Sequence, residues 1–464
     1  MMMLPKKTSL TIVTFGALLL LMQQAKFAKP YTPTGVVDFH PREVPTIVEP
    51  PRPRPQFKRN APPVAEPNLI DPHDQLKAFY QSLWRTEARQ PGAITRILHY
   101  GDSPTTADSI TADVRTLMQE HYGDAGHGFV LIAKPWAWYG HRGVDVSGKN
   151  WIIEAASQVR AKDGYHGLGG VNFQGGTGAS SHLVLREEHS RMEVQYLRQP
   201  GGGELDVHAG GEVIARIETD GDKLPAFEEV DIPADVRAID LTVERGPVRM
   251  FGVSFERNGP GVVYNSLGLN GGQVQAVVRN FDKGQWAEQL RHQQPDLVIV
   301  NYGTNESLYA DYIEHSYPGE LREVIRRIKS AVSNASVLIM SPMDRGQRDH
   351  SGQIVTPASL PRLVAIQRQV AAETDCAFFN TFQAMGGEGT MARWYDTQPR
   401  LVSADFMHPL PAGAKKVGVL LYQALESGYQ RYKANQEQRL AERDTPAREK
   451  SRGREVSPAR VGSQ

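Results

Sequence analysis

The sequence predicts an α/β fold in which a doubly wound parallel sheet carries an inserted all-β sandwich. Short apolar runs at residues 97–100, 297–302 and 337–340 have the length and composition of buried strands. Amphipathic helical stretches alternate with these runs, which favours a parallel sheet covered on both faces by right-handed crossovers. Between residues 145 and 256 the apolar period changes to two, which is typical of antiparallel strands.

The first strand-to-helix unit begins at residue 97. A short β-type run is followed by the tripeptide Gly-Asp-Ser that ends at Ser103, and apolar residues then recur at helical spacing from Ile110 to Met118. This transition predicts that Ser103 lies at the carboxyl end of a parallel strand, where open α/β sheets build their sites.

The second half of the chain repeats this alternation. The continuous apolar run at 297–302 predicts a strand buried on both faces. Further strands are expected at 337–340 and 377–379, and helices at 321–328, 360–370 and 411–429. The last helix starts with Pro411, in the first turn, where the missing N–H of proline is tolerated.

The predicted β insert covers residues 145–256. Alternating segments at 192–196 and 205–209 are separated by glycine turns, and the stretch contains neither a convincing helix nor a repeat. Glycines also gather at residues 175–178, but this stretch lacks the lysine and the strand-to-helix setting of a phosphate loop. We interpret it as a flexible loop.

The N-terminal residues predict export. Lys6 and Lys7 precede an apolar run within residues 8–24, so we expect residues 1–29 to be a signal peptide or an uncleaved membrane anchor. The protein would then act in the periplasm or cell envelope, tethered to the inner membrane if the segment is uncleaved. Residues 30–70 are rich in proline and predict an extended linker.

The remaining domain boundaries follow from composition. At 464 residues the chain should contain more than one folding unit. We expect the α/β domain to consist of residues 71–144 and 257–430, on either side of the insert. Residues 431–464 alternate charge with small side chains, which predicts a charged, disordered tail.

Charge and cysteine content exclude several classes of protein. Lysine plus arginine and aspartate plus glutamate number 52 each, so no net field favours nucleic acid. Cys376 is the only cysteine, which excludes an intrachain disulfide and a cysteine-based zinc site. We expect Cys376 to be an inert core residue, and no motif implies a metal or an organic cofactor.

Three further motifs follow Ser103 in the chain, and each is expected in a loop next to a strand or a helix. A small-residue loop ends at Gly271, Asn305 closes a Gly-Thr-Asn turn after the strand at 297–302, and Asp405 and His408 precede the last helix. A glycine N–H and an asparagine amide can donate to a reacting carbonyl oxygen, and an imidazole can activate a serine. The order serine, glycine, asparagine, histidine therefore indicates acyl-transfer chemistry.

With these motifs the chain resembles the SGNH (GDSL-type) hydrolase superfamily, whose domain is a flavodoxin-like doubly wound sheet. The resemblance covers residues from about 97 to 429, apart from the β insert. It implies that Ser103 is the nucleophile, His408 its base and Asp405 the carboxylate behind the histidine. The implied oxyanion hole consists of the Ser103 N–H, the Gly271 N–H and the Asn305 side chain.

Within that superfamily the sequence is similar to envelope enzymes that remove O-acetyl groups from peptidoglycan and carry a carbohydrate-binding-like sandwich in the same place. The implied partner is an acylated cell-envelope polysaccharide. A polysaccharide O-acyltransferase and a catalytically inactive polysaccharide-binding protein remain alternatives, and lipase or thioesterase activity is also open.

Pro104 separates this chain from the α/β-hydrolases. Their oxyanion hole uses the N–H of the residue after the nucleophile, which proline lacks. In the SGNH arrangement the N–H of the serine itself serves. The related envelope enzymes more often have histidine or leucine at this position.

Structural interpretations compete with these functional ones. Ser103 could cap a helix, Gly271 and Asn305 could serve turns, and His408 could be a surface histidine. We assign structural roles to His121, His127 and His141, because none has a metal-ligand spacing. We expect the aromatic cluster Trp136, Trp138 and Tyr139 to pack at the join to the insert rather than to stack on sugar rings.

Overall fold

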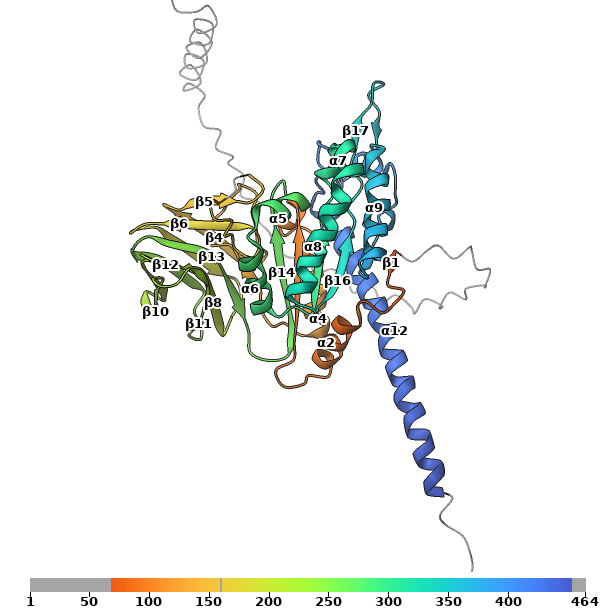
Figure 1. The fold of residues 1–464 in the computed structure, drawn as a ribbon, viewed down its shortest axis with the longest axis horizontal. Helices are drawn as coiled ribbons and strands as arrows, with labels where there is room; N and C mark the ends of the chain where they lie inside the picture. The colour runs from red at the N-terminus through yellow and green to blue at the C-terminus, as the bar shows by residue number, and fades with distance from the viewer. Residues whose placement is uncertain (1–67, 159–160, 453–464) are drawn as a thin grey trace, which may run out of the picture. The chain divides into compact units, whose positions relative to one another are not determined.

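The computed structural model describes residues 68–158 and 161–452, with side chains described as far as residue 439 (Figure 1). The predicted signal segment and all but the last residues of the proline-rich linker lie outside the described residues. Within the described ranges no helix combines the length and the apolarity needed to cross a membrane.

A six-stranded sheet forms the centre of the α/β domain, in the order β1-β19-β16-β15-β2-β14. Its strands are β1 (Leu69–Ile70), β2 (Ile94–Gly101), β14 (Gly261–Gly268), β15 (Leu297–Asn301), β16 (Ser336–Met340) and β19 (Ala377–Phe379). All neighbours are parallel except β1, which pairs antiparallel with β19 at the edge. The parallel strands have the chain order 2-1-3-4-5 that is typical of flavodoxin-like sheets, as predicted.

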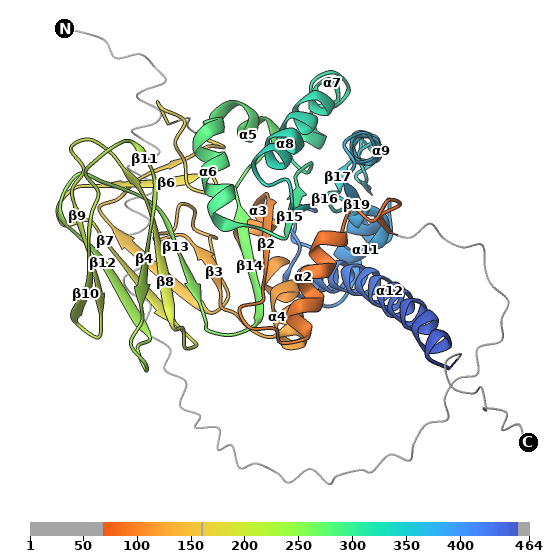
Figure 2. The same cartoon turned by 60° about the horizontal axis from the view of Figure 1, so that its bottom comes forward.

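Helices cover both faces of this sheet (Figure 2). On β2, Ile97 packs into one core cluster and its neighbour Leu98 into the other, because successive side chains of a strand point to opposite faces. The cluster around Ile97 includes side chains of α2 (Lys77–Glu87), α4 (Thr111–Tyr122) and α12 (Pro411–Arg452). The cluster around Leu98 includes side chains of α5 (Val274–Asn280), α6 (Lys283–Gln293), α8 (Tyr317–Ala331) and α9 (Ser359–Glu373).

Short elements complete the loops of this domain. They are α3 (Ser103–Thr106), the 3-10 helix η2 (Glu306–Leu308), α7 (Ala310–His315), the hairpin of β17 (Gln347–Arg348) and β18 (Ile354–Val355), α10 (Thr381–Ala384) and α11 (Thr390–Asp396). Cys376 is buried just before β19, in agreement with the expected core position.

Two antiparallel sheets lie on the β14 side of the parallel sheet (Figures 1 and 2). One has the order β10-β9-β12-β7-β4 and the other β11-β8-β13-β6-β5. The strands are β4 (Val144–Lys149), β5 (Ile152–Ala155), β6 (Val171–Gly175), β7 (Ser180–Leu185), β8 (Arg191–Arg198), β9 (Glu204–Ala209), β10 (Glu212–Glu218), β11 (Leu224–Asp231), β12 (Ala238–Arg245) and β13 (Val248–Glu256). We call residues 144–256 the β region.

The β region is joined to the α/β domain through β3 (Gly128–Val130), which pairs antiparallel with β13. Residues 128–130 fall within the segment 71–144 that was predicted to belong to the α/β domain, and a run of three residues is too short to show a period. Residues 175–178 join β6 to β7 without a helix, so the structure excludes a phosphate loop at this position.

The C-terminal helix continues beyond the span 411–429 predicted for it. The sequence also allows the charged tail at 431–464 to begin with a helical extension, and α12 continues to Arg452. Alanine, glutamate, glutamine, lysine and arginine dominate this part and all favour helix. Lys433 also pairs with Glu87 of α2 at 2.9 Å. Residues 453–464 lie outside the described residues.

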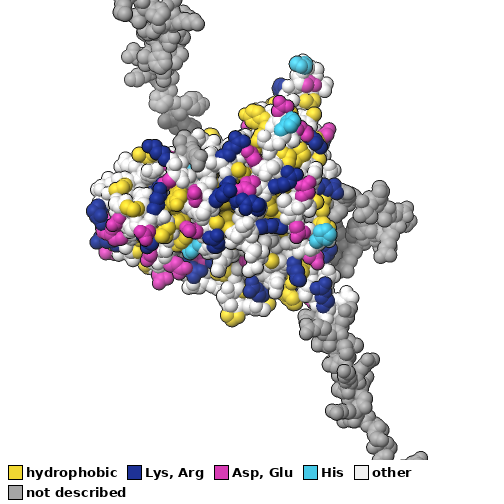
Figure 3. All heavy atoms as spheres, in the orientation of Figure 1, with side chains coloured by type: hydrophobic (Ala, Val, Ile, Leu, Met, Phe, Trp, Pro, Cys, Tyr) yellow, Lys and Arg dark blue, Asp and Glu magenta, His cyan; other side chains and the backbone are white. Residues whose placement is uncertain are grey.

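Positive and negative side chains are interspersed on the surface seen in Figure 3, without a face of one sign. This distribution agrees with the equal totals of basic and acidic residues in the sequence.

Candidate active site

Ser103 begins α3 directly after the central strand β2, as the sequence predicts. The turn needs a glycine before it, because a Cβ on Gly101 would lie 2.2 Å from Oγ1 of Thr105. Ser103 is half-buried, and its hydroxyl has no hydrogen-bond partner among the described residues. Asp102, and not Ser103, occupies the cap position, so helix capping does not account for this serine.

The loops that contain Gly271 and Asn305 follow β14 and β15, the two strands that flank β2. Gly268 at the end of β14 and Asn301 at the end of β15 are both in register with Gly101. The three strand ends therefore meet at one edge of the sheet.

These two loops are hydrogen-bonded to each other. Nδ2 of Asn305 donates to the carbonyl oxygen of Gly272 at 2.9 Å, which leaves the second N–H of that amide available. Gly271 has a φ of +65°, the left-handed region that favours glycine, and open space where a Cβ would be. Among the described residues, the backbone N–H groups of Ser103 and Gly271 donate to no other group.

His408 and Asp405 form a hydrogen-bonded pair in the loop before α12. Nδ1 of His408 lies 2.6 Å from Oδ2 of Asp405, so the N–H sits on Nδ1 and Nε2 is the acceptor. The other oxygen, Oδ1, accepts the backbone N–H groups of Met407 at 2.9 Å and His408 at 3.0 Å and the Ser403 hydroxyl at 2.5 Å. Partial burial raises the pKa of Asp405, but hydrogen bonds from Ser403 and His408 outweigh it and hold this pKa well below its usual range.

The charge of His408 acts on Asp102, the residue directly before Ser103. The carboxyl of Asp102 is buried, and burial raises its pKa to about 6, although a hydrogen bond with Thr304 and the charge of His408 both lower that pKa. His408 is therefore close enough to the neighbour of Ser103 for its charge to act there. The sequence does not reveal that Asp102 is buried, because burial depends on contacts with distant segments.

Comparison with known proteins adds family evidence to this geometry. The model of the GDSL-like lipase/acylhydrolase family matches residues 235–416. This segment contains Gly271, Asn305, Asp405 and His408, while Ser103 precedes it. A solved structure of a peptidoglycan O-acetylesterase matches with a TM-score of 0.67 and 23% identity, over 78% of this chain and 99% of that one.

Together, the family-model match and this likeness in fold support an SGNH-type ester hydrolase. Two other solved structures, an acetyl xylan esterase and a salicylyl-acyltransferase, match with TM-scores of 0.27 and 0.28 and identities of 16% and 13%. They cover 35% and 62% of this chain and 80% and 96% of their own, and at these scores they carry no argument. No curated protein matches the sequence.

Glu306 is a residue of the candidate site that the sequence motifs do not reveal. It directly follows Asn305, is fully buried, and accepts the backbone N–H of Val274 at 2.8 Å. It thus supplies a second hydrogen bond between the loops of Gly271 and Asn305. Burial raises the pKa of Glu306 to about 8, with a further increase from Asp102, so the carboxyl is largely protonated at neutral pH.

Replacing Glu306 with glutamine is expected to remove part of the pH dependence of stability. The carboxyl keeps its proton in the folded state up to about pH 8 but loses it near 4.5 when unfolded. Raising the pH through this window therefore lowers the free energy of unfolding, by at most about 1.4 kcal/mol per pH unit. Glu306→Gln stays neutral in both states and should lose this decline.

Denaturant unfolding at pH 5 and at pH 8 measures the effect. Glu288→Gln is a matched control, because Glu288 is an exposed glutamate of α6. The same pH dependence in wild type and Glu306→Gln would contradict a protonated Glu306 in the folded hydrolase.

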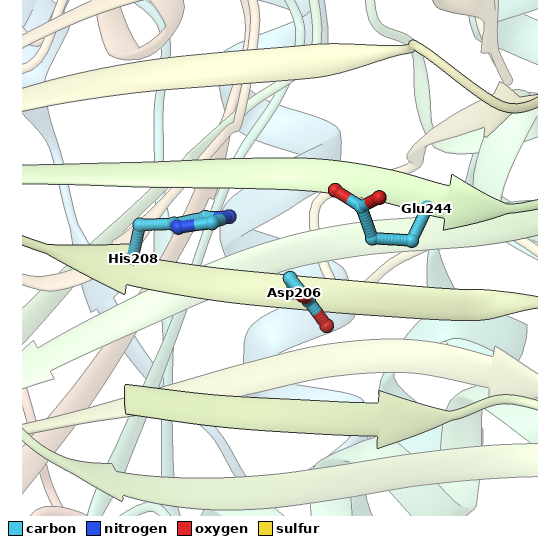
Figure 4. Close-up of side chains that lie close together, drawn as sticks. All are labelled: Asp206, His208 and Glu244. Carbon is cyan, nitrogen blue, oxygen red and sulfur yellow. The ribbon is translucent and has the colours of Figure 1, made fainter. Parts of the chain in front are cut away.

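Within the part of the chain that the structure describes, one group of acidic and histidine side chains away from this site has the closeness of metal ligands. Asp206 and His208 of β9 and Glu244 of β12 have ligand atoms within 4.8 Å of one another (Figure 4). However, Arg216 occupies both carboxylate oxygens of Asp206 at 2.8 Å. This arrangement is an ion pair on the exposed side of a sheet.

A histidine cluster lies where the β region meets the α/β domain. His127, His141 and His189 are buried, with ring centroids 5.5 Å and 4.8 Å from His127 to the other two. Burial lowers the pKa of all three, to about 2 for His127 and about 4 for the others, and Arg115 or Arg257 adds to each decrease. Nearby guanidinium groups disfavour a bound cation, so the structural role expected for His127 and His141 agrees with their surroundings.

The three residues of the predicted aromatic cluster differ in how far they are exposed to solvent. Trp136 and Tyr139 are buried, as the predicted packing role requires, and Tyr139 accepts the backbone N–H of Leu131 at 2.8 Å. Trp138 is 55% exposed, so the packing interpretation is wrong for this residue.

Proposed function

We propose that this hydrolase releases O-acyl groups, in particular O-acetyl groups, from a cell-envelope polysaccharide such as peptidoglycan. The Asp405–His408 pair at 2.6 Å is the observation that carries the proposal. It fixes the imidazole in the tautomer that a general base needs, at an edge of the sheet where Ser103 and two donor loops also lie. The similarity to a peptidoglycan O-acetylesterase supports the choice of substrate.

In the proposed mechanism, Nε2 of His408 takes the proton of the Ser103 hydroxyl while Oγ attacks the carbonyl carbon of the ester. The oxyanion accepts hydrogen bonds from the Ser103 N–H, the Gly271 N–H and the remaining N–H of Asn305. His408 then protonates the sugar oxygen as the ester bond breaks. Water, activated by the same histidine, releases the acyl group from Ser103.

The structure of the free protein leaves these groups available. Within the described residues, neither Oγ of Ser103 nor Nε2 of His408 has a hydrogen-bond partner, and they do not bond to each other. Catalytic hydrogen bonds commonly tighten only when substrate binds. Asp405 keeps the imidazole oriented and stabilises its positive charge during the reaction.

Acetate release by the full-length chain from O-acetylated peptidoglycan tests the proposal, with chemically deacetylated peptidoglycan and Ser103→Ala as controls. Release from the acetylated glycan only, and loss in the variant, is expected. Acetyl transfer to an added sugar acceptor without free acetate would instead establish an acyltransferase. Retention on the glycan without any turnover, on this or on simple acetyl esters, would establish a binding protein.

We also propose that the protein works in the periplasm or cell envelope, with residues 8–24 as a membrane anchor when uncleaved. The basic residues and apolar run at the N-terminus support this location, and so does a polysaccharide substrate outside the cytoplasm. N-terminal mass analysis of the protein from membrane and soluble fractions distinguishes anchor from cleaved signal.

A further inference from the structure

Trp138 presents an exposed aromatic surface beside the loop of Gly271. Its indole Nε1 donates to Oδ1 of Asn270, the residue before Gly271, at 3.1 Å. The carbonyl oxygen of Asn270 in turn accepts the Ser157 hydroxyl at 2.6 Å. One edge of the indole is thus bonded to the oxyanion loop while 55% of the residue remains exposed.

The turn that carries Trp138 is held in place on both sides. The N–H of Tyr139 donates to the carbonyl of Trp136 at 3.0 Å, and both of these neighbours are buried. The N–H of Gly140 donates to the carbonyl of Thr106 in the nucleophile helix α3 at 3.4 Å. The indole is therefore oriented before any ligand binds, which lowers the entropy cost of binding.

Few large hydrophobic side chains are exposed, and several of them are close in sequence to residues of this edge. Within the described residues, the large exposed hydrophobic residues are Trp138, Ile152, Ile153, Val213, Leu308 and Tyr309. Leu308 and Tyr309 follow Asn305 and Glu306, and Ile152 and Ile153 lie in β5, a few residues before Ser157. Only Val213, on β10, has no such connection. Trp138 is therefore one of few large apolar side chains that are open to a ligand.

A cleft of about 350 Å³ adjoins the same turn. The cleft is lined by residues 139–142 and by residues 107–109, which follow the nucleophile helix. Pro411, three residues after His408, also lines it. Lys134 and Asp145 add charges of both signs to its walls. These charged side chains can form hydrogen bonds with the hydroxyl and amide groups of a glycan.

We propose that Trp138 is a stacking platform for a pyranose ring of the substrate, and that the glycan chain continues into the cleft beside the nucleophile helix. The apolar C–H face of a sugar ring would cover the exposed indole, and its hydroxyls would remain available to polar groups. The inference rests on the proposed function for the class of substrate. It makes the enzyme selective for a glycan chain over a small ester.

Kinetics of full-length Trp138→Ala and Trp138→Phe on O-acetylated peptidoglycan and on p-nitrophenyl acetate test the platform. Trp138→Ala should lower kcat/KM on the polymer about tenfold, as loss of one aromatic contact of roughly 1.4 kcal/mol implies, through a higher KM. The decrease on the small ester should be at most about threefold. Trp138→Phe, which keeps a ring but not the N–H, should recover most of the activity on the polymer. Val213→Ala, an exposed apolar residue of the β region, is the matched control.

Equal losses on both esters would overturn the platform, because Trp138 would then act only by positioning Asn270 and the oxyanion loop. Unchanged kinetics on the polymer would also overturn it. If wild type hydrolyses the small ester but not the acetylated peptidoglycan, the proposed function fails. In that case binding tests the platform without turnover, by comparing the retention of Ser103→Ala and of the double variant Ser103→Ala/Trp138→Ala on deacetylated peptidoglycan. Weaker retention of the double variant supports the platform, and equal retention overturns it.

Discussion

Alanine at Ser103 or at His408 is expected to lower kcat/KM by about 10⁴-fold or more, and the double variant should lose no more than either single variant. The serine is a poor nucleophile without the imidazole, and the imidazole has no proton to take without the serine. Since the two groups act as one unit, their losses do not add. Steady-state kinetics on a soluble acetyl ester gives kcat/KM for the two single variants and the double variant.

His182→Ala is the matched control for the histidine substitution. Nδ1 of His182 lies 2.7 Å from Oδ1 of Asp240 in the β region, and both side chains are about half exposed, as in the His408 pair. Removing it should leave turnover unchanged. Additive losses in the double variant, or comparable activity in His408→Ala and His182→Ala, would contradict the assignment of His408 as the base.

Alanine at Asn305 is expected to lower kcat by about 100-fold to 1000-fold with a small change in KM. The Asn305 amide has one N–H left for the oxyanion after it donates to Gly272. An oxyanion forms only on the way to the tetrahedral intermediate, so this donor stabilises the transition state more than the bound substrate.

Asn150→Ala separates this effect from a general loss of structure. Nδ2 of Asn150 also donates to a glycine carbonyl, that of Gly178 at 3.1 Å, but in the β region. Turnover should survive that substitution. If Asn305→Ala raised KM with kcat unchanged, Asn305 would bind substrate in the ground state rather than serve the oxyanion hole.

The sequence was sufficient to predict the parallel sheet and the strand ends that carry Ser103 and Asn305. Runs such as residues 297–302 are buried on both faces and have the composition of a central strand whatever surrounds them. The pairing of Asp405 with His408 was also predictable, because three residues separate them in one loop.

Features that depend on contacts between distant segments were not predictable. Glu306 keeps its proton because distant segments bury it, and the indole of Trp138 is hydrogen-bonded to Asn270, which lies 132 positions away. The continuation of α12 past residue 430 is supported by Lys433 and Glu87, which are far apart in the sequence. In each case the sequence shows the residue type but not the distant residue that contacts it.

Covalent labelling with a fluorophosphonate, followed by peptide mapping, tests most directly the claim that Ser103 is the nucleophile. We predict one adduct per chain on Ser103, formed at the same rate at which esterase activity is lost, and no adduct with Ser103→Ala. Complete inactivation with the adduct on another residue, or normal turnover by Ser103→Ala, would contradict the account.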